Sequence, residues 1–145
     1  MSPFTEKRFL PRHTAEAEEK DRLLRAIAER LSREKDILFA YLHGSFINSS
    51  SFRDIDVGIY TRTRKDFYFV SELSYELSRS TGHEVEIKLI NEAPVAFQMA
   101  VLQEGKLVFS ADDDVRSAFI EKVGRRYRDY AHFRNIFMEA IGAGR

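Results

Sequence analysis

The stretch LHGSFINSSSFRDIDVGIY, residues 42–60, decides the fold. It begins at the end of the apolar segment DILFAYLH, passes Gly44-Ser45 and a polar spacer, and reaches Asp54-Ile55-Asp56-Val57. Because successive side chains of a strand point to opposite faces, Asp54 and Asp56 share one face and Ile55 and Val57 share the other. We therefore expect two strands joined by a short turn or helix, with two carboxylates side by side.

The rest of the chain supplies the partners of these strands. Alternation and short apolar runs predict strands near 37–43, 54–60, 84–90 and 106–109. Helical spacing predicts one helix after Thr14, one that ends near Gly82, one that starts at Pro94 and a last one from about Asp113. The two prolines among residues 1–13 favour an irregular N-terminal arm there. The predicted fold class is α/β (or α+β): one domain over residues 1–145, with a mixed sheet flanked by helices.

Composition narrows the class of protein. The chain has 145 residues, 43% of them hydrophobic, which is enough for the core of one domain. Its 23 basic and 23 acidic residues balance, which argues against bulk nucleic-acid binding. Cysteine is absent, so disulfides and thiolate chemistry are excluded. With no apolar run of membrane-spanning length and no signal-peptide pattern, we expect a cytoplasmic protein that does not bind membranes.

The carboxylates carry the chemistry that the sequence suggests. Two adjacent carboxylates repel each other unless a cation lies between them, and oxygen ligands suit magnesium. Glu86, in the middle of the alternating segment HEVEIKLIN, is the candidate for a third ligand of a two-metal site. Gly44 and Ser45 follow a buried strand and could hold an anion such as a triphosphate. The alternative for each feature is structural: solvated strand charges and a plain turn.

Taken together, His43-Gly44-Ser45, the eight-residue spacer FINSSSFR and Asp54-Ile55-Asp56-Val57 resemble the nucleotidyltransferase superfamily of DNA polymerase beta, and specifically its small MNT-type (minimal nucleotidyltransferase) members. The segments VEIKLINEAPVAFQMAVLQEGKLVF and RRYRDYAHFRNIF extend the resemblance over roughly residues 20–140. Glu86 stands where the family has an aspartate, and His43 stands where a bulky apolar residue is common.

The resemblance implies a polymerase-beta-like fold and an activity. The expected reaction is magnesium-dependent transfer of AMP from ATP to a hydroxyl. Gly44 and Ser45 would bind the nucleotide, and Asp54, Asp56 and Glu86 would be the catalytic and metal-binding residues. The implied acceptor is a tyrosine or other hydroxyl of an HEPN-type toxin, which makes the protein an antitoxin.

Two other functions stay open at this point. One is an antitoxin that only binds and masks its partner, through the last helix around Arg125, Arg128 and Tyr130. The other is a nucleotidyltransferase that acts on a small molecule such as an aminoglycoside. The oligomeric state is open as well, a homo-oligomer included, as are the roles of Arg53 and Lys88.

Overall fold

The strands form one mixed sheet. The computed structural model describes residues 2–44 and 54–142, and the side chains of residues 17–44 and 54–142. The strands are β1 (Ile37–His43), β2 (Asp54–Thr61), β3 (Glu84–Leu89) and β4 (Lys106–Ser110). Their order across the sheet is β3-β2-β1-β4. Strand β1 is antiparallel to both of its neighbours, whereas β2 and β3 are parallel. This mixed sheet and its four strands confirm the prediction.

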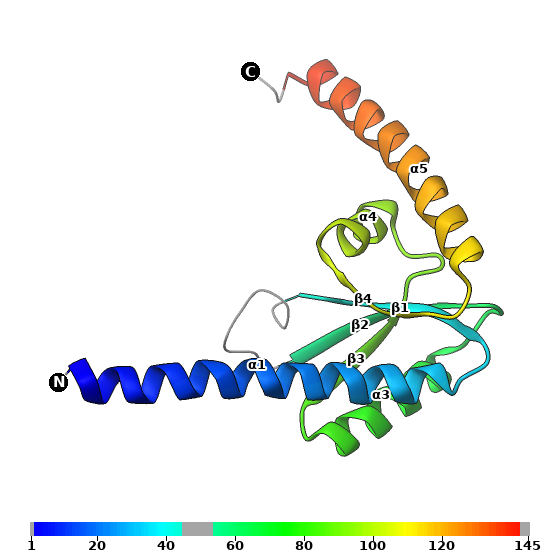
Figure 1. The fold of residues 1–145 in the computed structure, drawn as a ribbon. Coiled ribbons are helices and arrows are strands. Elements are labelled where there is room, and N and C mark those ends of the chain that lie inside the picture. The colour runs from blue at the N-terminus through cyan, green and yellow to red at the C-terminus, as the bar shows by residue number, and fades with distance from the viewer. Residues whose placement is uncertain (1, 45–53, 143–145) are drawn as a thin grey trace.

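Helices cover both faces of the sheet. The described helices are α1 (Ser2–Ser32), α3 (Phe67–Thr81), α4 (Val95–Glu104) and α5 (Asp113–Ala140). Helices α1 and α3 lie on one face, and α4 and the first half of α5 lie on the other (Figure 1). Parallel strands need a crossover connection, and α3 provides it between β2 and β3. The short segment after Ser45 that was expected to form a turn or helix lies outside the described residues.

Two hydrophobic cores follow from the alternation of the strands. Ile55, Val57 and Ile59 of β2 pack in the core beneath α1 and α3, together with Val85 and Ile87 of β3. The other core lies beneath α4 and α5 and contains Leu38, Phe39, Tyr41, Ile90, Val101, Phe119 and Val123. Strand β1 contributes to both cores, which explains why its sequence is apolar throughout instead of alternating.

Local signals set the ends of two helices. The Asp66 side chain accepts a hydrogen bond from the Phe69 backbone N–H at the start of α3, and Asp112 does the same for Val115 at the start of α5. Gly82 ends α3 in the left-handed conformation, with φ of 76°. Because Asp112 caps α5 two residues after the end of β4, the helix begins directly beside the sheet.

The N-terminal segment differs from the prediction. The prolines were expected to make residues 1–13 irregular, but α1 begins at Ser2. A proline in the first turn of a helix costs no hydrogen bond, because the first backbone N–H groups have no partner within the helix. Pro11 removes one further hydrogen-bond donor from a helix of 31 residues. The helical preference of the residues around it outweighs that loss.

Candidate active site

Glycine is required where β1 ends. Gly44 directly follows β1 and has φ of +87°, a conformation that residues with a side chain rarely adopt. A Cβ atom at this position would lie 2.8 Å from Oδ2 of Asp56. His43, the residue before it, is the register partner of Asp56 on β2. The backbone at Gly44 therefore lies against the Asp56 carboxylate, and only glycine permits that approach.

Two of the predicted carboxylates are neighbours in the sheet. Asp56 and Glu86 are register partners on the parallel strands β2 and β3, and Asp54 is the partner of Glu84. Side chains of register partners point to the same face, here the one opposite buried Ile55. Asp54 is the first residue of β2 and is exposed, whereas Asp56 is half-buried. Folding thus brings together an aspartate and a glutamate that are 30 residues apart in the chain.

His43 is packed beside these carboxylates. Its ring contacts Phe97 of α4 edge-on, with 5.3 Å between the ring centroids. Its Nε2 atom is buried and has no hydrogen-bond partner among the described residues. Burial lowers the pKa of His43 below its ordinary value of 6.5, although the negative charge of Asp56 opposes the effect. His43 is therefore neutral at pH 7, and its ring, packed against Phe97, forms one wall of the site.

Lys88 brings a positive charge to the same region. It lies two residues after Glu86 on β3, and its Nζ lies 5.6 Å from the centroid of the Phe97 ring. His43 and Lys88 thus both contact Phe97, and the positive charge of Lys88 also contributes to lowering the pKa of His43. Sequence analysis identified Lys88 but not Phe97, because Phe97 belongs to a helix that is apolar on most sides.

The donor chemistry suits a hard cation, but only in part. Asp56 and Glu86 offer oxygen ligands from neighbouring strands, and the lack of a side chain at Gly44 leaves room for the Asp56 carboxylate. Within residues 17–44 and 54–142, no three His, Asp or Glu side chains converge closely enough to form a metal site. The structure thus places Asp56 beside Glu86, and metal binding by Asp54, Asp56 and Glu86 stays a prediction. Ser45, the other predicted nucleotide-binding residue, lies outside the described part.

A cavity of about 490 Å³ opens at the other end of β2. Arg62, Arg64 and Lys65 contribute to its lining, and Lys65 pairs with Asp36 at 2.6 Å. None of the predicted site residues lines this cavity, so cavity size does not point to the carboxylates. No helix in the described ranges is long and apolar enough to cross a membrane.

The comparison with protein families agrees with this geometry. The family model described as "Polymerase beta, Nucleotidyltransferase" matches residues 25–114, which include β1, β2, β3 and every predicted site residue. The chain therefore belongs to the polymerase beta nucleotidyltransferase family, and it is a nucleotidyltransferase by class. The curated proteins contain no match.

Solved structures show the same fold. One is a chain from the tri-AMPylated HEPN toxin of Shewanella oneidensis in complex with MNT antitoxin. It has 18% identity and a TM-score of 0.70, and the match covers 84% of this chain and 98% of that one. A chain from a toxin–antitoxin structure with AMP-PNP has 20% identity and a TM-score of 0.69, and the match covers 81% and 97%. A chain of the MntA–HepT toxin–antitoxin structure has 18% identity, 83% and 97% coverage and a TM-score of 0.67. At these identities the likeness shows the fold.

Proposed function

We propose that this protein is an antitoxin that transfers AMP from ATP to a hydroxyl group, such as a tyrosine, of an HEPN-type toxin. The observation that carries the proposal is the pairing of Asp56 with Glu86, with the Gly44 backbone against the Asp56 carboxylate. A pure binding protein gains nothing from two like charges on adjacent strands, because they repel each other unless a cation is shared. A nucleotidyltransferase needs this arrangement.

The proposed roles follow from position. Gly44 and Ser45 bind the β- and γ-phosphates, since a glycine backbone allows close approach of the triphosphate. Asp54, Asp56 and Glu86 would hold two magnesium ions. Magnesium, when bound, neutralises phosphate charge and lowers the pKa of the acceptor hydroxyl. Lys88 faces the same region and can contact a phosphate oxygen.

The proposed transfer of AMP needs only ATP and the acceptor hydroxyl as reactants. The acceptor oxygen forms a bond to the α-phosphorus of ATP, and the bond from that phosphorus to the bridging oxygen breaks. Pyrophosphate leaves with the bonding electrons, and Glu86 helps to withdraw the acceptor's proton. The packed rings of His43 and Phe97 would limit the access of water at one side of this site, which would disfavour hydrolysis in place of transfer.

The solved structures support the choice of nucleotide and acceptor. The Shewanella oneidensis structure contains an AMPylated HEPN toxin with its MNT antitoxin, and another toxin–antitoxin structure contains AMP-PNP, an analogue of ATP. Their fold covers four fifths of this chain or more. AMP transfer by this protein would give a reason for the pair of carboxylates, Asp56 and Glu86, on β2 and β3.

One observation favours a second candidate, an antitoxin that masks its partner without catalysis. The described side chains do not converge into a three-carboxylate site, and Asp54 is exposed at the start of its strand. A small-molecule acceptor, the third alternative, has no specific support among the described features. The binding-only candidate is therefore the one that the experiment must exclude.

The double variant Asp54→Asn/Asp56→Asn separates these functions, because it removes the metal-binding charges and nearly preserves shape. Its control, Asp21→Asn/Glu72→Gln, removes the same charge from exposed positions of α1 and α3. Each is mixed with radiolabelled ATP, magnesium and a purified HEPN-type toxin. We expect the double variant to lose at least about 100-fold in AMP transfer, to keep binding its partner, and to stop neutralising it, while the control behaves as wild type.

Two results would overturn the proposal. If the wild type transfers no AMP to the toxin, the acceptor is wrong. If the folded double variant still neutralises the toxin as well as wild type does, catalysis is irrelevant and the protein acts by masking.

A further inference from the structure

One face of α5 is apolar along its whole length, but only its first half is covered. Phe119 and Val123 are buried, at 6% and 0% exposure. The same face continues, at helical spacing of three or four residues, through Tyr130, Phe133, Phe137 and Ile141, which we call the α5 stripe. Phe133 is 70% exposed, Phe137 52% and Ile141 58%. The stripe thus continues a core-facing surface beyond the point where the core ends.

Exposed aromatics in a row are unusual on a protein that works alone. A single exposed apolar side chain needs no explanation, whereas a contiguous patch marks a binding surface. A helix gains most of its stability in a protein from packing of its apolar face. No residue of the second half of α5, from 127 to 140, is fully buried among the described residues, so we infer that another molecule completes the packing.

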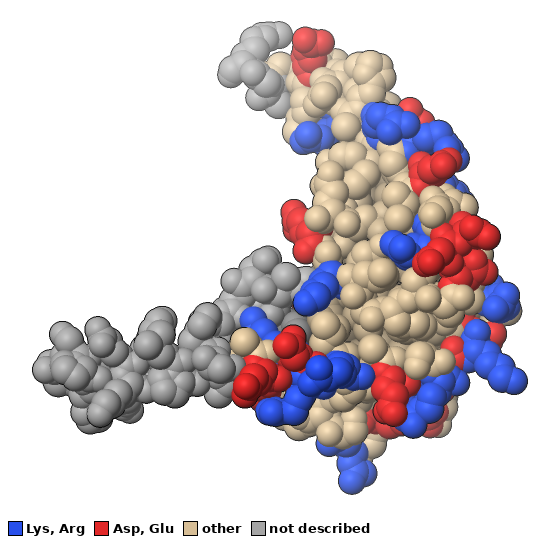
Figure 2. Space-filling model, in the orientation of Figure 1, with Lys and Arg blue, Asp and Glu red and all other residues tan. Residues whose placement is uncertain are grey.

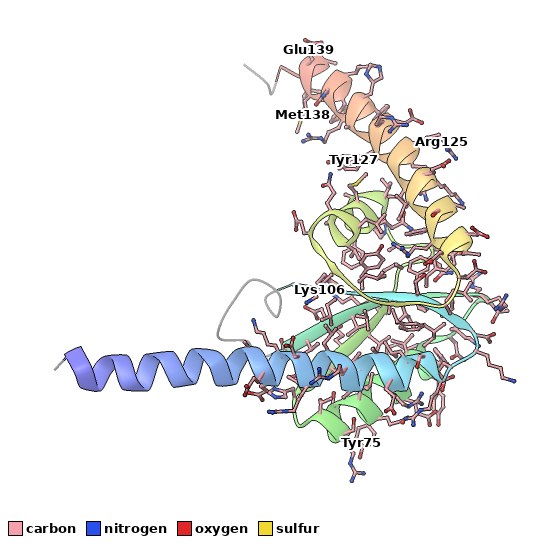
Figure 3. All side chains as sticks on the ribbon, in the orientation of Figure 1. Tyr75, Lys106, Arg125, Tyr127, Met138 and Glu139 are labelled. Carbon is pink, nitrogen blue, oxygen red and sulfur yellow. The ribbon has the colours of Figure 1, made fainter. Side chains whose placement is uncertain are left out.

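The stripe overlooks the candidate active site. Helix α5 rises from the sheet and leans over the side at which β1 ends and β2 begins (Figure 1). Figure 2 shows the molecule hollowed on this side, where uncharged side chains predominate along α5. Tyr127 and Met138 lie on the hollow side of α5 and Arg125 on the opposite side, while Lys106, at the start of β4, marks the site end of the sheet (Figure 3). A molecule that fills the hollow beside α5 would therefore lie on the side of the sheet at which β1 ends and β2 begins.

Charge distinguishes between the candidate occupants. Residues 124–141 contain four arginines and two carboxylates, a net charge of +2, whereas the whole chain is neutral. Arg126 and Arg134 are exposed and fall on the stripe side of the helix by spacing. A second copy packed against the stripe would bring these arginines close to their counterparts, which is unfavourable. A partner with an apolar groove rimmed by carboxylates would satisfy both the aromatics and the arginines.

We propose that the α5 stripe is the surface on which the HEPN-type toxin docks, so that its acceptor hydroxyl is presented across the hollow to Asp56 and Glu86. This inference rests on the proposed function and names the surface by which the acceptor is chosen. The proposed surface shares Tyr130 with the surface expected from sequence but not Arg125, which points away from the hollow and contacts Glu121 at 3.5 Å. Specificity for the toxin would then come from a helix that contains none of the catalytic residues.

The test is the variant Phe133→Ser/Phe137→Ser, with Phe67→Ser/Tyr75→Ser as the matched control. Phe67 and Tyr75 are 83% and 64% exposed on α3, on the other side of the sheet. Binding to the HEPN-type protein is measured by calorimetry, and AMP transfer is measured at rising toxin concentration. We expect the α5 variant to bind about 30-fold or more weakly, with transfer restored at high toxin concentration, and the control to match wild type. A photo-crosslinking residue at position 137 should capture the toxin, and one at position 75 should not.

The outcomes separate this inference from the proposed function. If wild type modifies the toxin and the α5 variant binds it with unchanged affinity, the docking surface is elsewhere and the proposed function stands. If wild type does not modify the toxin at all, the proposed function fails first. If the isolated chain is a dimer by sedimentation, and the α5 variant is a monomer with normal toxin affinity, a second copy covers the stripe and the inference is wrong.

Discussion

Replacing Gly44 with alanine tests the close approach at the candidate active site. Two costs are expected. The first is the left-handed backbone conformation, which costs a residue with a Cβ atom about 1–2 kcal/mol. The second is contact: the new Cβ would lie 2.8 Å from Oδ2 of Asp56, whereas ordinary contacts begin at 3.4 Å. The carboxylate must therefore retreat by roughly 0.6 Å, the difference between these distances.

Gly82 offers a matched control. It has φ of +76°, close to the value at Gly44, but a Cβ atom there would have nothing within 4 Å. Gly82→Ala therefore carries only the backbone cost, which predicts a loss of about 2–8 °C in melting temperature for a chain of this size. Gly44→Ala should lose at least as much stability.

The Gly44→Ala and Gly82→Ala variants should differ in their rate of AMP transfer. A displacement of about half an ångström exceeds the tolerance of a catalytic group, so Gly44→Ala should reduce AMP transfer by roughly 10- to 100-fold. Gly82→Ala should keep wild-type transfer at a temperature where it is folded. If both variants lose equal stability and Gly44→Ala keeps its activity within about twofold of wild type, the contact between Gly44 and Asp56 has no catalytic role.

Two further predictions concern the framework that holds the site. Gln98 is fully buried, and its Nε2 donates to the backbone oxygens of Ile90 and Asn91. Gln98→Met should therefore lower the free energy of unfolding, measured by chemical denaturation, by about 1–3 kcal/mol. The same change at exposed Gln103 of the same helix should cost almost nothing, and equal losses at the two positions would contradict the reasoning. Arg30 of α1 binds Glu76 of α3 and lowers the pKa of that carboxyl below 4.5, so Glu76→Gln should destabilise the protein by about 0.5–1 kcal/mol at pH 7. Because the folded-state pKa is depressed, that difference should disappear as the pH falls below 4.5, and a difference that persists at pH 2 would show another cause.

Most of the sheet could be predicted from the sequence because its signals are local. Alternation at Ile55, Val57 and Ile59 fixed the faces of β2, and the same pattern around Glu86 identified β3. The pairing of Asp56 with Glu86 then required only that the two strands be neighbours, which the family resemblance implied.

The features that escaped prediction depend on contacts distant in sequence. The wall formed by His43 and Phe97 joins a strand end to a helix more than 50 residues later, and neither residue carries a signal of that contact. The two halves of α5 have the same apolar spacing, so periodicity could not show that Val123 is buried and Phe133 is exposed. At the N-terminus, the two prolines were interpreted as helix breakers, but the structure has helix from Ser2 onward.

The connections between the strands mean that the two parts of the candidate site, Gly44 with Asp56 and then Glu86, come together at different stages of folding. Gly44 and Asp56 belong to antiparallel neighbours that follow each other directly, a local pairing that closes a short loop. Glu86 joins them only after the chain has passed through α3 and laid β3 parallel to β2. An incompletely folded chain can therefore hold the glycine and the aspartate without the glutamate. We expect the protein to acquire catalytic competence with the crossover through α3, so that a chain in which β3 has not yet paired with β2 cannot transfer AMP.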